Sequence, residues 1–169
     1  MAHDVFISYS HKNAVIADAV CHRFEEKGIR CWYAPRDIRP GENWAASIIR
    51  ALADAKLMVL IFTGDSNVSV QVHREVDAAL SAGIPIIPFR CSADEPVDSM
   101  RYYLAGLHWI DAIEGELEDS IVRLLEQTRR LLSASANGFG TSNSGATEPV
   151  GHKRKKVIFA LAAGFLTLC

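Results

Sequence analysis

Two short groups of polar residues follow apolar, strand-like runs, where their side chains could do chemistry. Ser8, Tyr9 and Ser10 close the first run, and Asp65 follows a second run at residues 57–62. Carboxylates gathered at the ends of two such strands would hold Mg²⁺, as in a phosphorylated response regulator. Only Asp65 is acidic here, so the sequence disfavours that class.

The sequence also lacks the signatures of several common enzymes. It has no GxGxxG after the first strand-like run, and no GxxxxGKS/T, GxSxG or HExxH. Their absence disfavours a dehydrogenase, a P-loop NTPase, an α/β-hydrolase and a zinc protease. The four cysteines form no CxxC pair and no zinc-like spacing with histidine: Cys21, Cys31, Cys91 and Cys169. We therefore expect no metal site and interpret residues 1–132 as a reduced, intracellular domain.

Strand-like and helix-like segments alternate along residues 1–132. β-Branched or apolar runs predict strands at residues 4–9, 29–33, 57–62, 84–89 and 108–111. Helical spacing of apolar residues predicts helices at 13–27, 44–55, 70–82, 100–107 and 117–132, the first ending at Gly28. This order is typical of a doubly wound α/β fold with a five-stranded parallel sheet. Such sheets bind ligands beyond the carboxyl ends of their strands, which are the predicted loops 8–10, 35–41 and 63–69.

The composition changes after residue 132. Residues 133–152 are rich in Ser, Gly, Asn and Ala and are expected to form a flexible linker. The basic cluster 153–156 then precedes the uncharged residues 157–169. We interpret this run as the start of a transmembrane helix in a truncated chain, a single-pass C-terminal anchor that holds the domain on the cytoplasmic side of the inner membrane. An apolar tail, or a helix docked on the domain, is the alternative.

The charge of the chain argues against one class of partner. The net charge is −2, and without the four basic residues at 153–156 it becomes −6. Binding to nucleic acid requires clustered positive charge on the domain. We expect no nucleic-acid partner.

Three motifs in the order of the chain carry a resemblance to a known family. Residues 4–10 (DVFISYS) resemble the first signature box of Toll/interleukin receptor (TIR) domains, and residues 31–44 (CWYAPRDIRPGENW) resemble their second box and BB loop. Residues 66–76 (SNVSVQVHREV) resemble the segment after their third strand. With residues 85–90 and 102–104, the resemblance is to bacterial TIR domains and covers about residues 1–132. It implies a flavodoxin-like five-stranded parallel sheet with helices on both faces.

The resemblance implies two kinds of function. Some TIR domains cleave NAD at the nicotinamide–ribose bond, some of these cyclise the ADP-ribose product, and activity follows self-association of TIR domains. Others are non-catalytic modules that recruit further TIR domains in membrane-tethered signalling. We expect an NAD glycohydrolase of bacterial signalling or antiphage defence, with NAD as substrate and no other cofactor. An effector directed at host TIR signalling is a third reading, which the expected membrane anchor disfavours.

The enzyme class implied by the resemblance depends on a glutamate after the third strand, which matches Glu75. Departure of nicotinamide leaves positive charge on the ribose, and a nearby carboxylate stabilises that charge. The alternative for Glu75 is a solvated helix residue that pairs with Arg74. Enzymes of this family often carry Trp where this chain has Gln71. Two alternatives follow: another aromatic residue (Trp44, Trp32 or Tyr33) stacks on the base, or the activity is slow.

Further residues are implied at the site by the same match. Those expected to contact NAD are Ser8, Tyr9, Ser10, Trp32, Arg36, Asp37, Trp44 and Gln71. Those expected to gate the site or dock on a neighbouring domain form the BB loop: Arg36, Asp37, Ile38, Arg39, Pro40 and Gly41. Trp32 can equally be a core residue, like Phe6, and the loop charges can simply be solvated. His11 and His73 are read as surface histidines.

Overall fold

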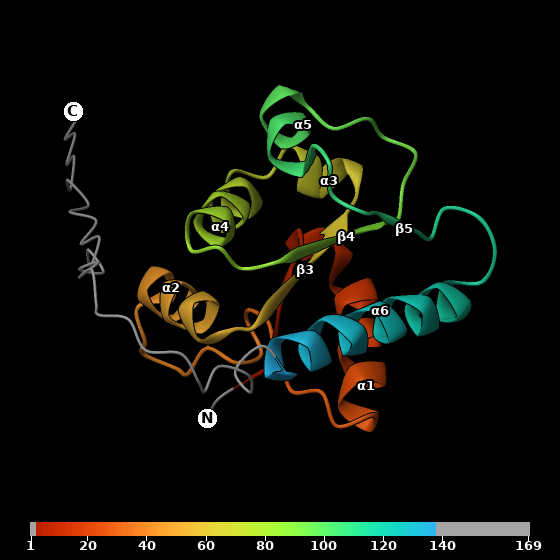
Figure 1. Cartoon of the computed structure of the whole chain (residues 1–169). Coiled ribbons are helices and arrows are strands. Elements are labelled where there is room, and N and C mark those ends of the chain that lie inside the picture. Colours follow the sequence, from red (N-terminus) through yellow and green to blue (C-terminus); the bar gives the residue numbers. More distant parts are fainter. Residues whose placement is uncertain (1–2, 138–169) are drawn as a thin grey trace, which may run out of the picture.

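The computed structural model describes residues 3–137 and has five parallel strands in the order β2-β1-β3-β4-β5 (Figure 1). The strands are β1 (Val5–Ser8), β2 (Cys31–Trp32), β3 (Leu57–Phe62), β4 (Ile86–Arg90) and β5 (Ile110–Asp111). The helices are α1 (Ala14–Glu26), α2 (Trp44–Asp54), α3 (Gly64–Asn67), α4 (Val70–Ser81), α5 (Asp98–Leu104) and α6 (Leu117–Asn137), and a 3-10 turn, η1 (His11–Asn13), precedes α1. The predicted five-stranded, flavodoxin-like parallel sheet is confirmed.

Helices cover both faces of the sheet (Figure 1). Alternate side chains of one strand enter different cores: Val5 and Ile7 of β1 pack with α1 and α6, while Phe6 packs with α2, α4 and α5. All six residues of β3 are buried, as expected for the central strand of a parallel sheet. The sheet thereby forms a rigid platform between two apolar layers.

Local interactions set the end of α1 and the end of β2. Gly28 follows α1 with φ +79°, a left-handed conformation that favours glycine, as predicted for the end of this helix. The second strand is shorter than the predicted residues 29–33. The Tyr33 amide donates to the Asp37 carboxylate (3.0 Å) instead of continuing the ladder, so the chain turns into the loop of residues 33–43.

The predicted loop 63–69 is wrong in part, because it contains α3. Thr63 and Ser66 form a reciprocal capping box: the Ser66 amide donates to the Thr63 hydroxyl (3.2 Å), and the Thr63 amide donates to the Ser66 hydroxyl (2.8 Å). These bonds satisfy the donors that a helix start leaves unpaired. Asn67, at the end of α3, then accepts from the Val97 amide and donates to the Glu95 carbonyl, which holds the segment before α5.

The fourth strand begins two residues later than predicted. Pro85 has no amide hydrogen to donate, although its carbonyl accepts from the Met58 amide (2.9 Å). Pro88 lies inside the strand, but β5 pairs only with Phe89 and Arg90, after the proline. Pro88 therefore does not interrupt the pairing between β4 and the short strand β5.

The last helix is longer than predicted, and the expected start of the linker at residue 133 is wrong for residues 133–137. The hydroxyls of Ser133 and Ser135 donate to the carbonyls of Arg129 and Leu131, each four residues earlier, so both serines follow the helical path. The remainder of the expected linker, the basic cluster and the expected transmembrane segment lie outside the described residues. Within residues 3–137, no helix combines the length and the apolar character needed to span a membrane.

Candidate functional site

A cavity of about 280 Å³ opens at the carboxyl end of β1. The start of α2, the start of α4 and the loop of residues 33–43 form its walls. Its lining residues are Phe6, Ile7, Tyr9, His11, Ala34, Pro35, Trp44, Ile48, Ser69, Gln71 and Glu75. It lies at the strand end where parallel α/β sheets bind their ligands.

Glu75 provides the carboxylate of this cavity. It lies on the face of α4 that packs into the core beside Val72, Val76 and Ala79, and only 7% of its surface is exposed. The Ser8 hydroxyl donates to its Oε2 (2.6 Å), and the Gln71 amide donates to its Oε1 (2.9 Å). Glu75 is therefore a buried, hydrogen-bonded residue and not a solvated partner of Arg74.

The environment of Glu75 has two opposing effects on its acidity. Burial disfavours the charged form and raises the pKa of the carboxyl, while the hydrogen bonds from Ser8 and Gln71 favour the carboxylate and lower the pKa. Burial has the larger effect, so the pKa is raised overall. A buried carboxyl with a raised pKa beside a cavity is a frequent feature of functional sites.

Tyr9 joins the end of β1 to the opposite wall of the cavity. Its hydroxyl donates to the Ala34 carbonyl, and its ring meets the Tyr33 ring edge-on at 5.9 Å. Burial raises the pKa of the Tyr9 hydroxyl, and the charges of Asp18 and Glu75 raise it further. Tyr9 therefore serves as a neutral hydrogen-bond donor that holds the loop against the sheet.

Trp44 and Gln71 stand at the open side of the cavity. Trp44 begins α2 and is 49% exposed, after Asn43 caps the helix through its side chain. Gln71 lies in the first turn of α4, which Ser69 caps. Of the residues predicted from the sequence to contact NAD, the structure thus brings Tyr9, Trp44 and Gln71 together with Glu75, and places Ser8 directly behind the carboxylate.

Arg36 and Asp37 do not line the cavity. Arg36 turns towards α1, while the Asp37 carboxylate accepts from the Tyr33 amide and from Arg36. The Arg36 guanidinium donates to the Cys21 thiol and the Cys31 carbonyl (2.8 Å each) and lies 4.7 Å from the centre of the Tyr33 ring. Arg36 also pairs with Glu25 and Asp37. These contacts give both residues an observed role in fixing the start of the loop.

The other predicted residues lie outside the cavity lining. Trp32 stacks on Phe6 with ring centres 5.0 Å apart, in keeping with its alternative assignment to the core, and Ser10 is buried before η1. Ile38 packs at the edge of the core, whereas Arg39, Pro40 and Gly41 are exposed and Gly41 has φ +85°. Among the described residues, the tip of the loop is therefore exposed.

The structure adds cavity residues that the sequence reasoning did not select. Ser69 and Ile48 line the cavity, and His11, read as a plain surface residue, also lines it. A signal was present for Ser69, since serine before a predicted helix is a common cap. Ile48 gave no such signal, because an apolar helix residue looks the same whether it lines a cavity or a core.

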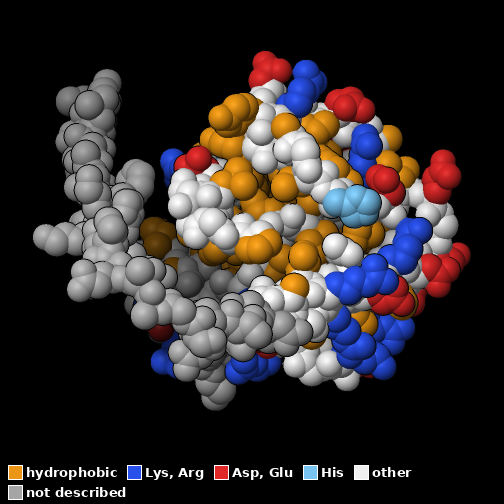
Figure 2. Space-filling view, viewed as in Figure 1, with side chains coloured by type: hydrophobic (Ala, Val, Ile, Leu, Met, Phe, Trp, Pro, Cys, Tyr) orange, Lys and Arg blue, Asp and Glu red, His pale blue; other side chains and the backbone are white. Residues whose placement is uncertain are grey.

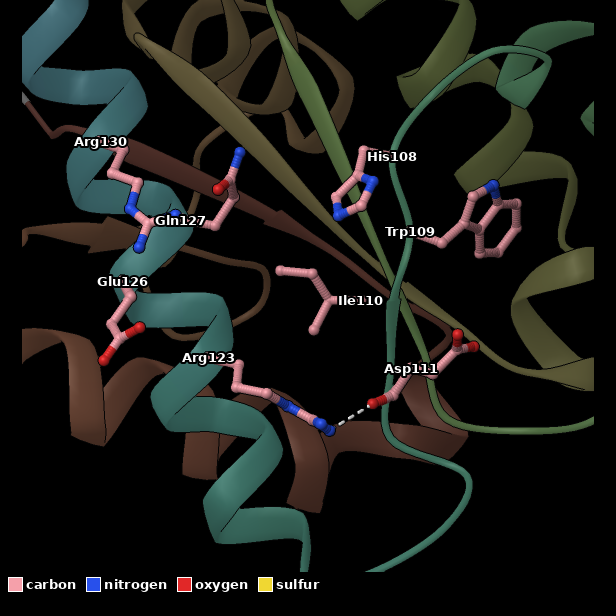
Figure 3. Close-up of a pocket in the computed structure, with 8 residues that line it drawn as sticks. All are labelled: His108, Trp109, Ile110, Asp111, Arg123, Glu126, Gln127 and Arg130. Atoms are coloured by element: carbon pink, nitrogen blue, oxygen red, sulfur yellow. Dashed lines mark hydrogen bonds between the residues drawn. The ribbon is translucent and has the colours of Figure 1, made fainter.

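A second hollow of about 320 Å³ lies between β5 and α6 (Figure 3). Arg123 reaches across it from α6 and donates to the Asp111 backbone carbonyl (2.7 Å), while Gln127 and Arg130 follow on the same helix. Basic and acidic side chains gather over α6 in the space-filling view (Figure 2). This hollow contains no buried carboxylate and none of the predicted site residues. In residues 3–137, no three His, Cys, Asp or Glu side chains are grouped to hold a metal ion.

Comparisons with known proteins support the assignment of this fold. A family model described as "TIR domain" matches residues 5–125. No curated protein matches the sequence. The TIR domain of the Toll-related receptor TRR-2 from Hydra magnipapillata is similar in structure, with 21% identity and a TM-score of 0.64 over 75% of this chain and 98% of that one.

Two further solved structures share the fold at low identity. A metazoan TIR-STING receptor from C. gigas has 22% identity and a TM-score of 0.59, with 76% of this chain and 39% of that chain covered. The CMP N-glycosidase BcmB from Clostridium botulinum has 17% identity and a TM-score of 0.53, with 72% and 97% covered. At these identities the likeness shows a common fold.

Proposed function

The chain belongs to the TIR-domain family, and from this premise we propose that it is an NAD glycohydrolase that uses Glu75. The observation that carries the proposal is the buried Glu75 carboxylate at a cavity, held by Ser8 and Gln71. The similarity to a CMP N-glycosidase adds support, because that protein is named for cleaving an N-glycosidic bond on the same fold.

Cleavage of NAD requires mainly a negative charge close to the ribose. The bond between ribose C1′ and the pyridinium nitrogen breaks, and nicotinamide leaves with the electron pair as a neutral molecule. Positive charge then develops on the ribose, where a buried carboxylate stabilises it strongly because little water screens the interaction. Water attacks C1′ and loses a proton, which yields ADP-ribose; attack by an atom of the adenine ring would yield a cyclic product.

The cavity accommodates one end of the dinucleotide. Its volume of about 280 Å³ is near the lower end of ligand pockets. We therefore expect only the nicotinamide riboside end, whose scissile bond must reach Glu75, to enter. Among the described residues, no Lys or Arg lines the cavity. A neighbouring TIR domain that supplies positive charge to the diphosphate would explain why activity should follow self-association.

A non-catalytic interaction module is the second candidate function. Exposed apolar side chains lie on the helices that border the cavity, including Ile49 of α2 (55% exposed) and Val70 of α4 (65% exposed). A contiguous group of exposed apolar side chains marks a protein interface, whereas single ones are ordinary on a protein surface. A module of this class would bind other TIR domains without any need for Glu75.

Nicotinamide release by the full chain at increasing protein concentration separates the two functions. The enzyme hypothesis predicts release from NAD with a specific activity that rises as the protein self-associates. Chromatography of the products distinguishes ADP-ribose from a cyclic form. Self-association without nicotinamide release at any concentration would favour the interaction module and contradict the proposal.

A further inference from the structure

We infer that Gln71 is a positioning residue that, together with Ser8, fixes the Glu75 carboxylate in one orientation and stabilises its ionised form. This inference rests on the proposed function for its catalytic consequence. The two hydrogen bonds to Glu75 are present in the protein without substrate, so their effect on Glu75 can be tested independently of any activity.

The two donors approach opposite oxygens of the carboxylate from different elements. Ser8 ends β1 and bonds Oε2 at 2.6 Å, while Gln71 lies one turn before Glu75 on α4 and bonds Oε1 at 2.9 Å. Residues four positions apart on a helix are neighbours, so the helix itself aligns the amide with the carboxylate. Two bonds from two directions restrict rotation of the carboxyl group about its last torsion.

The two donors differ in how strongly they favour the ionised form of Glu75 over the protonated form. A serine hydroxyl can donate to a carboxylate or accept from a carboxylic acid, so Ser8 tolerates both forms of Glu75. The amide nitrogen of Gln71 only donates. Protonation of Glu75 at Oε1 would place two donors face to face and force the amide to turn over. Protonation at Oε2 instead leaves Oε1 as a neutral carbonyl oxygen, which accepts more weakly than a carboxylate oxygen. In the orientation present, the Gln71 bond is therefore strongest with ionised Glu75.

Few other groups act on this carboxyl. Tyr9 and His11 are the other titratable side chains that line the cavity, and no Lys, Arg or Asp lines it among the described residues. The effects acting on the Glu75 pKa are burial, which raises it, and the hydrogen bonds from Ser8 and Gln71, which lower it. Removal of the Gln71 donor should therefore be visible as a further rise in the pKa of Glu75.

The direct test is a titration of the Glu75 carboxyl by NMR in the full chain labelled with carbon-13 glutamate, with Glu75→Gln used to assign the signal. Gln71→Met keeps the length of the side chain and removes the donor. A hydrogen bond to a charged group has an effect of about one pH unit on a titration midpoint, so the midpoint should rise by about that amount. Gln127→Met makes the same chemical change on α6, outside the cavity lining, and should leave the midpoint in place.

A midpoint for Gln71→Met that equals or falls below that of the unchanged protein would overturn the inference. Because Gln71 is exposed and in the first turn of its helix, the variant should stay folded, which circular dichroism verifies. With NAD as substrate, the acid limb of kcat/KM should move to higher pH by the same amount. If NAD is not cleaved at all, the proposed function fails, and the NMR titration still decides the role of Gln71.

Discussion

The Ser8 hydroxyl, at the carboxyl end of β1, donates a hydrogen bond of 2.6 Å to the Glu75 carboxylate on α4, 67 residues later in the chain. The bond ties the sheet to the helix that carries the candidate catalytic residue. Since both groups are buried, little water competes for either partner. The position of the carboxylate is thus set by the fold and not by a mobile loop.

Replacement of Ser8 by alanine should weaken NAD cleavage while the fold is retained. The loss of one hydrogen bond to a charged group predicts a decrease in kcat of about tenfold near neutral pH. Steady-state kinetics measure the decrease, and Ser133→Ala on the exposed part of α6 is the matched control. Equal activity of both serine variants would show that the bond to Glu75 has no part in the reaction.

The rate should depend on pH through Glu75. Burial raises the pKa of this carboxyl above the usual value of 4.5, and the carboxylate is the active form. Activity is therefore complete above the raised pKa and is lost as the pH falls through it. A profile of kcat/KM against pH locates this acid limb. A limb at or below 4.5, the usual value, would contradict the assignment of Glu75.

Replacement of Tyr9 by phenylalanine should loosen one wall of the cavity. The variant loses the bond to the Ala34 carbonyl, so the loop of residues 33–43 should exchange its amide hydrogens faster. We expect KM for NAD to rise several-fold, in line with the loss of about 1 kcal/mol from one neutral hydrogen bond. Hydrogen exchange by mass spectrometry together with steady-state kinetics measures both effects. Unchanged exchange in this loop would show that Tyr9 does not hold it.

Stability should depend on the two cores and little on exposed aromatic residues. Phe89 of β4 is fully buried, so Phe89→Ala should lower the free energy of unfolding by about 3–5 kcal/mol. Tyr102 is 81% exposed, and Tyr102→Ala should change it by about 0.5 kcal/mol or less. Urea unfolding measures the free energy of unfolding of both variants. A similar loss for both variants would contradict the assigned packing.

The sequence predicts the architecture well because hydrophobic periodicity reports burial. The continuous apolar run at Leu57–Phe62 coincides with β3, and Gly28 marks the end of α1. The errors arise where local polar bonds decide the structure. The Thr63–Ser66 capping box forms at the start of α3 inside a predicted loop. The helix α6 continues to Asn137, and Ser133 and Ser135, which composition assigns to a linker, bond back to carbonyls of the preceding turn.

The candidate site is less accessible from sequence alone. Gln71 and Glu75 are four residues apart and meet on one helix, but the bond from Ser8 to Glu75 depends on the topology that places β1 beside α4. The direction of the Arg36 side chain could not be predicted from its position in the sequence. Arg36 follows a strand end, as a ligand residue would, yet its guanidinium turns to Cys21 and the Cys31 carbonyl, and sequence gives no direction for a side chain on a loop.

Cleavage of NAD should depend on the Glu75 carboxylate, and nicotinamide release by the Glu75→Gln variant measures this dependence. The amide has nearly the same shape without the charge, so we expect a rate at least about a hundredfold below that of the unchanged protein. Arg74→Gln, on the exposed side of the same helix, should retain the full rate. Nicotinamide release by Glu75→Gln at the rate of the unchanged protein would contradict the account.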